Sequence, residues 1–232
     1  MSPPIQPTAS GPAHRPAQPW VIRAAHWANA VLLVVMAGSG MQILAAYPFL
    51  GARGAPYRWY PLQGAEPPHV LTIGGWLAGA RHWHFAFAWL FAANALLYAV
   101  YLLTSREWRR RLFWPPRDAR NAWGTALHDL GLRKEQPPPA GLYNGMQRLA
   151  YTAALALAAI LVLSGLALYE PVQLPRLTAL LGGYDAARAV HLLALAGLGV
   201  FLVVHVIQVV RHPRAIADMV TGGRPRPSEA RR

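Results

Sequence analysis

Histidine is the residue type in this sequence best suited to bind a metal, and its spacing is informative. Four of the nine histidines lie in, or at the edge of, long apolar stretches: His26, His84, His191 and His205. His191 and His205 are 14 residues apart, which on an α-helix gives about 21 Å of rise and returns to within about 40° of the same face. Their imidazoles would therefore point the same way at two depths of one helix.

The elements that position these histidines are four stretches without formal charge, at residues 27–52, 85–105, 149–169 and 189–210. Each can supply the roughly 20 apolar residues that a membrane-spanning helix needs, and none alternates as a barrel strand does. The composition agrees, because 54% hydrophobic and 13% charged residues are unusual in soluble domains. We therefore predict an all-α membrane protein, a four-transmembrane-helix bundle over residues 20–216 with spans at about 24–46, 82–104, 147–169 and 188–211.

The basic residues predict the orientation of this bundle. With both termini cytoplasmic, 17 of the 22 Lys and Arg residues lie on the cytoplasmic side, as the positive-inside rule requires. The run from Arg106 to Arg111 then contacts anionic lipid, which accounts for much of the net charge of +13. Because no recognition motif accompanies the charge, we predict contact with the lipid bilayer and not with nucleic acid. Residues 1–19, rich in proline, are predicted to be a disordered cytoplasmic tail, and residues 217–232 a second tail.

This orientation places the four histidines at two matched depths. His84 opens the second span on the outer side, level with His191, whereas His26 opens the first span on the cytoplasmic side, level with His205. Two imidazoles on facing helices fill the axial positions of a b-type haem, whose porphyrin supplies the other four nitrogens. The sequence has no cysteine, which excludes thiolate ligands and covalent haem attachment. We therefore predict that the bundle holds two b-type haems, with these four histidines as iron ligands.

An arginine lies three residues before three of these histidines, on the same helical face. A guanidinium suits a bidentate contact with a haem propionate, although each arginine could instead extend its charge to the membrane surface. The same pattern selects His84 over His82 as a ligand. The pairs are Arg23 with His26, Arg81 with His84, and Arg188 with His191.

Small residues interrupt the apolar stretches near the histidines. Ser39-Gly40 lies in the first span and Ser164-Gly165 in the third, and Gly197 and Gly199 lie between the two histidines of the fourth. Such residues allow close approach of a flat macrocycle or of a neighbouring helix.

Residues 20–216 resemble the di-haem cytochrome b subunits of nickel–iron hydrogenases, formate dehydrogenases and thiosulfate reductases, in the bacterial cytochrome b561-type group. The histidine quartet carries the resemblance. The segments Gly79–Tyr101 and Tyr143–Tyr151 look most like the thiosulfate-reductase-type members. One position departs from that pattern, because Gly145 stands where we expect proline.

The resemblance implies electron transfer across the bacterial inner membrane, between the quinone pool and a periplasmic oxidoreductase, which we expect to be a molybdenum enzyme. It also implies a quinone near His26 and His205. Asn144 and Gln147, at the cytoplasmic start of the third span, are then candidate partners for a quinone oxygen, although they could equally cap the helix. Complexes of this kind can pair across two copies, so a homodimer is compatible with the sequence.

Three other functions are compatible with parts of the pattern. A stand-alone quinone-linked cytochrome b could act on a small molecule such as superoxide. A histidine-lined transporter of metal ions or protons would use intramembrane histidines, but the spans contain no Asp or Glu. A purely structural anchor would leave the matched depths unexplained. The aromatic-rich outer segment, residues 47–81, either anchors helix ends or forms a docking surface for a partner.

Overall fold

The computed structural model describes residues 18–135, 137–138 and 142–223, so residues 1–17 of the predicted N-terminal tail and residues 224–232 of the predicted second tail lie outside the described residues. Within these ranges, four helices are long and apolar enough to cross a membrane: α1 (Trp20–Ala46), α2 (Leu77–Thr104), α5 (Gly145–Tyr169) and α7 (Tyr184–Arg211). Each helix ends where the sequence analysis ended its span and begins two to five residues earlier. The described chain is all-α apart from one very short hairpin.

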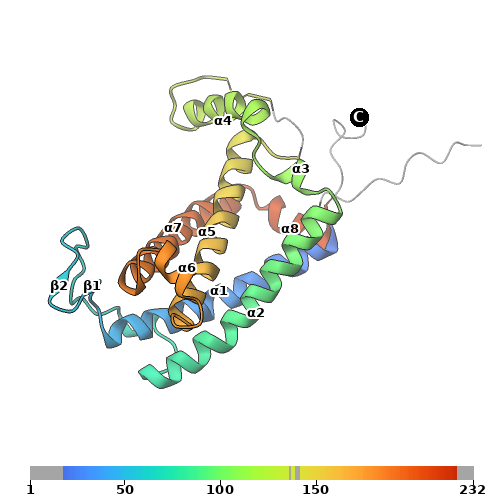
Figure 1. Cartoon of the computed structure of the whole chain (residues 1–232). Coiled ribbons are helices and arrows are strands. Elements are labelled where there is room, and N and C mark those ends of the chain that lie inside the picture. Colours follow the sequence, from blue (N-terminus) through green and yellow to red (C-terminus); the bar gives the residue numbers. More distant parts are fainter. Residues whose placement is uncertain (1–17, 136, 139–141, 224–232) are drawn as a thin grey trace, which may run out of the picture.

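The long helices form two antiparallel pairs, in which α1 packs along α2 and α5 packs along α7 (Figure 1). Large apolar side chains remain exposed on the outside of both pairs, for example Val34, Leu97 and Val203, which are 66%, 68% and 61% exposed. Such surfaces suit contact with acyl chains, because within the bilayer the helix satisfies its own backbone groups.

Short elements lie at the two ends of the bundle. At the end where α1 begins are α3 (Trp108–Arg111), α4 (Pro115–Asp129) and α8 (Arg214–Thr221); at the other are β1 (Gly51–Ala52), β2 (Ala55–Pro56), η1 (His69–Leu71) and α6 (Pro175–Leu180) (Figure 1). The two strands pair antiparallel, with Gly51 opposite Pro56. Residues 217–221, predicted to belong to a tail, are part of α8. The side chains of Arg23 and Trp27 on α1 donate hydrogen bonds to carbonyls near the end of α8 and hold it against α1.

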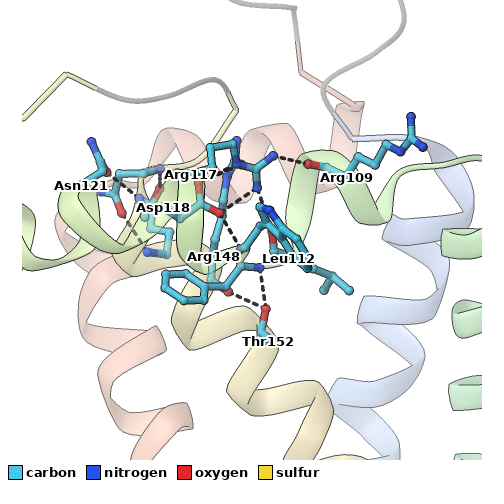
Figure 2. A network of polar contacts seen from close by, with 12 residues as sticks. Arg109, Leu112, Arg117, Asp118, Asn121, Arg148 and Thr152 are labelled. Atoms are coloured by element: carbon cyan, nitrogen blue, oxygen red, sulfur yellow. Dashed lines mark hydrogen bonds and ion pairs between the residues drawn. The ribbon is translucent and has the colours of Figure 1, made fainter.

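A buried carboxylate fixes α4 on the start of α5 (Figure 2). Asp118 is fully buried and accepts hydrogen bonds from Arg117 at 2.7 Å and from the backbone N–H of Trp114 at 2.8 Å. Arg148 of α5 donates to the same carboxylate at 3.3 Å. Because the charge is both paired and hydrogen-bonded, its burial is compensated.

This network predicts that acid loosens α4. Burial by itself would raise the pKa of the Asp118 carboxyl, but the hydrogen bonds from Arg117 and Trp114 and the charge of Arg148 hold that pKa below its usual value. A carboxyl with a depressed folded pKa contributes stability above its unfolded pKa of about 3.9, and that stability is lost as the pH falls through the folded value. We expect the amide protection factors of α4, measured by hydrogen exchange in nanodiscs, to fall below about pH 4.

Asp118→Asn is expected to lower the same protection factors already at pH 7. Asp129→Asn, which changes an exposed acid at the end of the same helix, is the matched control and should leave them unchanged. Equal protection of α4 in wild type and Asp118→Asn would contradict the role of this carboxylate.

Candidate functional site

The structure brings the four histidines of the sequence analysis together in two pairs. The ring centres of His84 on α2 and His191 on α7 lie 6.3 Å apart, and those of His26 on α1 and His205 on α7 lie 6.1 Å apart. The ring planes of the two pairs are inclined at 67° and 57°. Each pair therefore joins the α1–α2 hairpin to α7 across the bundle.

The separation of the rings tests whether a metal fits between them. With metal–nitrogen bonds of about 2.0 Å, and each nitrogen about 1.1 Å from its ring centre, the centres of two axial imidazoles lie about 6.2 Å apart. The observed 6.3 Å and 6.1 Å match this distance. Both pairs therefore fit an iron with one imidazole on either side.

A serine sets the hydrogen bonding of each imidazole in the first pair. The Ser39 hydroxyl donates to the carbonyl four residues earlier at 2.6 Å and lies 3.0 Å from Nδ1 of His84. The Ser164 hydroxyl makes the same two contacts, at 2.6 Å to the carbonyl and 2.9 Å to Nδ1 of His191. Because a carbonyl can only accept, the hydroxyl hydrogen is used there, and each Nδ1 is left as a donor. Its acceptors are the serine oxygen and a backbone carbonyl, that of Met36 for His84 and that of Leu161 for His191. The Nε2 lone pair of both rings is left for iron.

The glycines that follow these serines leave room for the rings. A Cβ at Gly40 would lie 3.3 Å from Cε1 of His84, and one at Gly165 would lie 3.4 Å from Cε1 of His191. Gly197 instead meets a leucine of α5 at 3.3 Å. The close approach predicted for these glycines is therefore present at Gly40, Gly165 and Gly197, where imidazoles and a neighbouring helix approach. It is not present at Gly199, where a Cβ would meet no atom of the described residues within 4 Å.

The second pair has different surroundings. Nδ1 of His26 is buried and has no hydrogen-bond partner in the described part of the chain. Beside it, Asn94 on α2 donates to the carbonyl of Ala25 at 3.1 Å and to the side chain of Asn29 at 2.8 Å, which holds α1 against α2. These two asparagines were not predicted from the sequence, although polar side chains inside spans are a recognised signal.

The three arginines predicted to face propionates lie one helical turn from their histidines. Arg188 donates to two carbonyls of the segment after α1 at 3.3 and 3.1 Å. Arg23 donates to a carbonyl of α8, and the guanidinium of Arg81 lies 5.4 Å over the ring of Phe85. Their contacts with a propionate stay a prediction.

Asn144 and Gln147 form a reciprocal cap at the start of α5. The Asn144 side chain accepts from the backbone N–H of Gln147 at 2.8 Å, and the Gln147 side chain accepts from that of Asn144 at 3.1 Å. This is the helix-capping alternative considered above. Their contact with a quinone stays a prediction.

A buried polar cluster, whose tyrosines pack against Ile22 and Ala25 of α1, was not predicted from the sequence. The hydroxyls of Tyr98 and Tyr151 contact each other directly. Arg111, assigned to lipid contact because of its charge, is fully buried; it donates to the Tyr143 hydroxyl at 3.1 Å and to Glu107 at 3.0 Å. Because Arg111 is buried, its assignment to the lipid surface is wrong. The Glu107 carboxylate and the Tyr143 hydroxyl compensate the burial of its charge.

Long apolar helices with two facing pairs of imidazoles across a bundle have the arrangement expected of a membrane cytochrome of the b type. Residues 17–222 match the family described as prokaryotic cytochrome b561, and the chain belongs to that family. It is a multi-pass protein of the prokaryotic cytoplasmic membrane, and the cofactor that the family implies is haem b.

A curated relative from Azospira oryzae, named "Putative protein-methionine-sulfoxide reductase subunit YedZ1", is 38% identical over 205 residues, which cover 88% of this chain and 94% of the relative. No solved structure matches the chain. The cytochrome b561 resemblance predicted from the histidine pattern is confirmed. The relative's name is that of a methionine sulfoxide reductase subunit, whereas the sequence analysis favoured thiosulfate-reductase-type members as the nearest group.

Proposed function

We propose that this chain is the membrane subunit of a two-component reductase and transfers electrons from the quinone pool to an oxidoreductase on the periplasmic face. The observation that carries the proposal is the pair of imidazole couples that bridge the two hairpins at 6.3 and 6.1 Å. Haem b held at each couple supplies one-electron redox chemistry. Both termini lie in the cytoplasm in this proposal, as the distribution of basic residues favours.

The residues of the chain hold and separate these two centres. His84 and His191 bind one iron, and His26 and His205 bind the other. Within α7, the 14 residues from His191 to His205 span about 21 Å along the helix axis, so the two centres lie near opposite membrane surfaces. Arg23, Arg81 and Arg188 contact the propionates, each from one helical turn away.

The name of the relative suggests the reaction of the partner. We propose that the partner reduces protein-bound methionine sulfoxide and, as the sequence analysis expected, uses molybdenum. Each sulfoxide takes up two electrons and two protons to give methionine and water, and oxidation of one quinol to quinone releases two of each. The quinol binds at the end that contains His26 and His205, with Asn144 and Gln147 as its candidate contacts.

The first test is the haem content of the purified chain, for which a pyridine haemochromogen assay should give two haems b per chain. The second follows the reduced cytochrome spectrum after quinol is added. Oxidised protein containing methionine sulfoxide should reoxidise the cytochrome only when a co-expressed periplasmic reductase is present.

The outcomes separate the alternatives. A chain without haem would overturn the proposal. Quinol-dependent reaction with superoxide at the same rate with and without the reductase would instead favour the stand-alone enzyme. Reoxidation by thiosulfate, and not by methionine sulfoxide, would reassign the partner.

A further inference from the structure

The two helical hairpins repeat each other in register. Ser39 and Ser164 each lie 19 residues after the first residue of their helices, α1 and α5. His84 and His191 each lie seven residues after the first residue of α2 and α7. The two serine–histidine contacts therefore come from equivalent positions of equivalent helices, although 45 residues separate one serine from its histidine and 27 separate the other.

The same register treats the two histidine pairs differently. His84 and His191 occupy equivalent positions of the two hairpins, so each hairpin contributes one equivalent histidine to this pair. It relates His26 to Tyr151, each six residues into its helix, and His205 to Tyr98, each 21 residues into its helix. At the positions equivalent to His26 and His205, the other hairpin combination therefore has Tyr151 and Tyr98, whose buried hydroxyls contact each other.

The two histidine pairs also differ in the hydrogen bonds that their Nδ1 atoms make. Both rings of the symmetric pair donate Nδ1–H to a fully buried serine hydroxyl, at 3.0 and 2.9 Å. Nδ1 of His26 is buried without a hydrogen-bond partner among residues 18–135, 137–138 and 142–223. A serine in any helix can donate its hydroxyl hydrogen to the carbonyl four residues earlier. Ser39 and Ser164 do this and also present an oxygen lone pair to an imidazole.

We infer that Ser39 and Ser164 are positioning residues for the metal centre of His84 and His191. Each serine, beside a backbone carbonyl that favours the same tautomer, accepts the Nδ1–H hydrogen; this favours the form that presents Nε2 to iron and makes the imidazole a stronger electron donor. Stronger donation stabilises the oxidised iron and lowers the reduction potential of this centre. The inference rests on the proposed haem binding but is independent of the quinone and of the partner.

Ser39→Ala and Ser164→Ala test this inference separately, because they stand at equivalent positions. Each is expected to raise the reduction potential of one of the two haems, leave the other unchanged, and weaken haem binding at the affected centre roughly tenfold, as loss of a supporting contact to a ligating histidine does. Potentiometric titration of the full-length chain, followed in the α-band and by electron paramagnetic resonance, measures both potentials. The titration is repeated with the additional substitution His26→Ala, which is expected to remove the second haem, so that only the haem of His84 and His191 contributes to the spectrum.

Thr104→Ala is the matched control, because the Thr104 hydroxyl makes the same bond to the carbonyl four residues earlier, at 2.9 Å, and is on the membrane-spanning helix α2. It should change neither potential, and Ser39→Thr and Ser164→Thr, which keep the hydroxyl, should restore the wild-type value. Unchanged potentials in both alanine variants, or shifts equal to that of Thr104→Ala, overturn the inference while the haem content stands. A wild-type chain that binds no haem overturns the proposed function itself.

Discussion

Replacing His84 with alanine is expected to reduce the haem content from two per chain to one. Alanine cannot coordinate iron, and the facing imidazole of His191, 6.3 Å away ring to ring, then has no second axial partner across the bundle. The proposed electron path is interrupted at that centre, so quinol should no longer reduce an acceptor on the opposite face. The haem content is measured by pyridine haemochromogen, and the surviving low-spin signal by electron paramagnetic resonance.

The pairing itself is tested by comparing which signal each variant removes. His191→Ala must abolish the same haem signal as His84→Ala. His26→Ala and His205→Ala, each tested as a single variant, must both abolish the signal of the second haem. His82→Ala is the control, because His82 is exposed and lies two residues from His84, about 200° around the helix. Loss of different signals in His84→Ala and His191→Ala, or loss of a haem in His82→Ala, would refute the ligand set.

The helices were predictable because they depend on properties local in sequence. A charge-free stretch of about 20 residues has few stable alternatives to a membrane helix. The predicted last residues coincide with those of α1, α2, α5 and α7, and the predicted first residues lie two to five residues too late. The spacing of 14 residues between His191 and His205 is fixed by helix geometry, so it indicated two imidazoles on one face before any contact was known.

The contacts that surround the histidines were not predictable, because they depend on how each helix is rotated about its axis. Ser39 and Ser164 were interpreted only as small residues, since nothing local shows that their hydroxyls face imidazoles 45 and 27 residues away. Arg111 was assigned to the lipid surface for a similar reason. Its charge and the nearby Glu107 are visible in the sequence, but its burial also depends on Tyr143 and Gln18, which come from distant segments.

Gly145 shows a case in which the structure explains a departure from the expected pattern. Gly145 is the first residue of α5, where proline is ordinarily favoured because the first turn needs no N–H donor. Here the N–H donates to the side chain of Asn121 on α4 at 2.6 Å. A Cβ on this residue would lie 2.5 Å from the carbonyl oxygen of Asp118 and 2.6 Å from the backbone nitrogen of Ala122. Glycine therefore allows the backbones of α4 and α5 to meet.

Gly145→Pro is consequently expected to destabilise the protein, whereas proline at a first helical position usually stabilises. The overlap with α4 should contribute about 1–3 kcal/mol and the lost hydrogen bond about 1 kcal/mol, which together correspond to a fall in Tm of roughly 4–16 °C for a chain of this size. Thermal unfolding in detergent, with amide exchange across α4, measures the effect.

Two further variants divide the effect of Gly145→Pro between its causes. Gly145→Ala keeps the N–H and adds the Cβ, so it should show most of the loss in Tm. Asn121→Ala removes the acceptor and adds no atoms, so it should lower Tm by less and expose the backbone N–H of Gly145. Because α5 starts at this contact and α4 is held there by Asp118 and Arg148, amide protection should fall first in α4 and only later in α7. A proline variant as stable as the wild type would show that the backbones of α4 and α5 do not approach each other at Gly145.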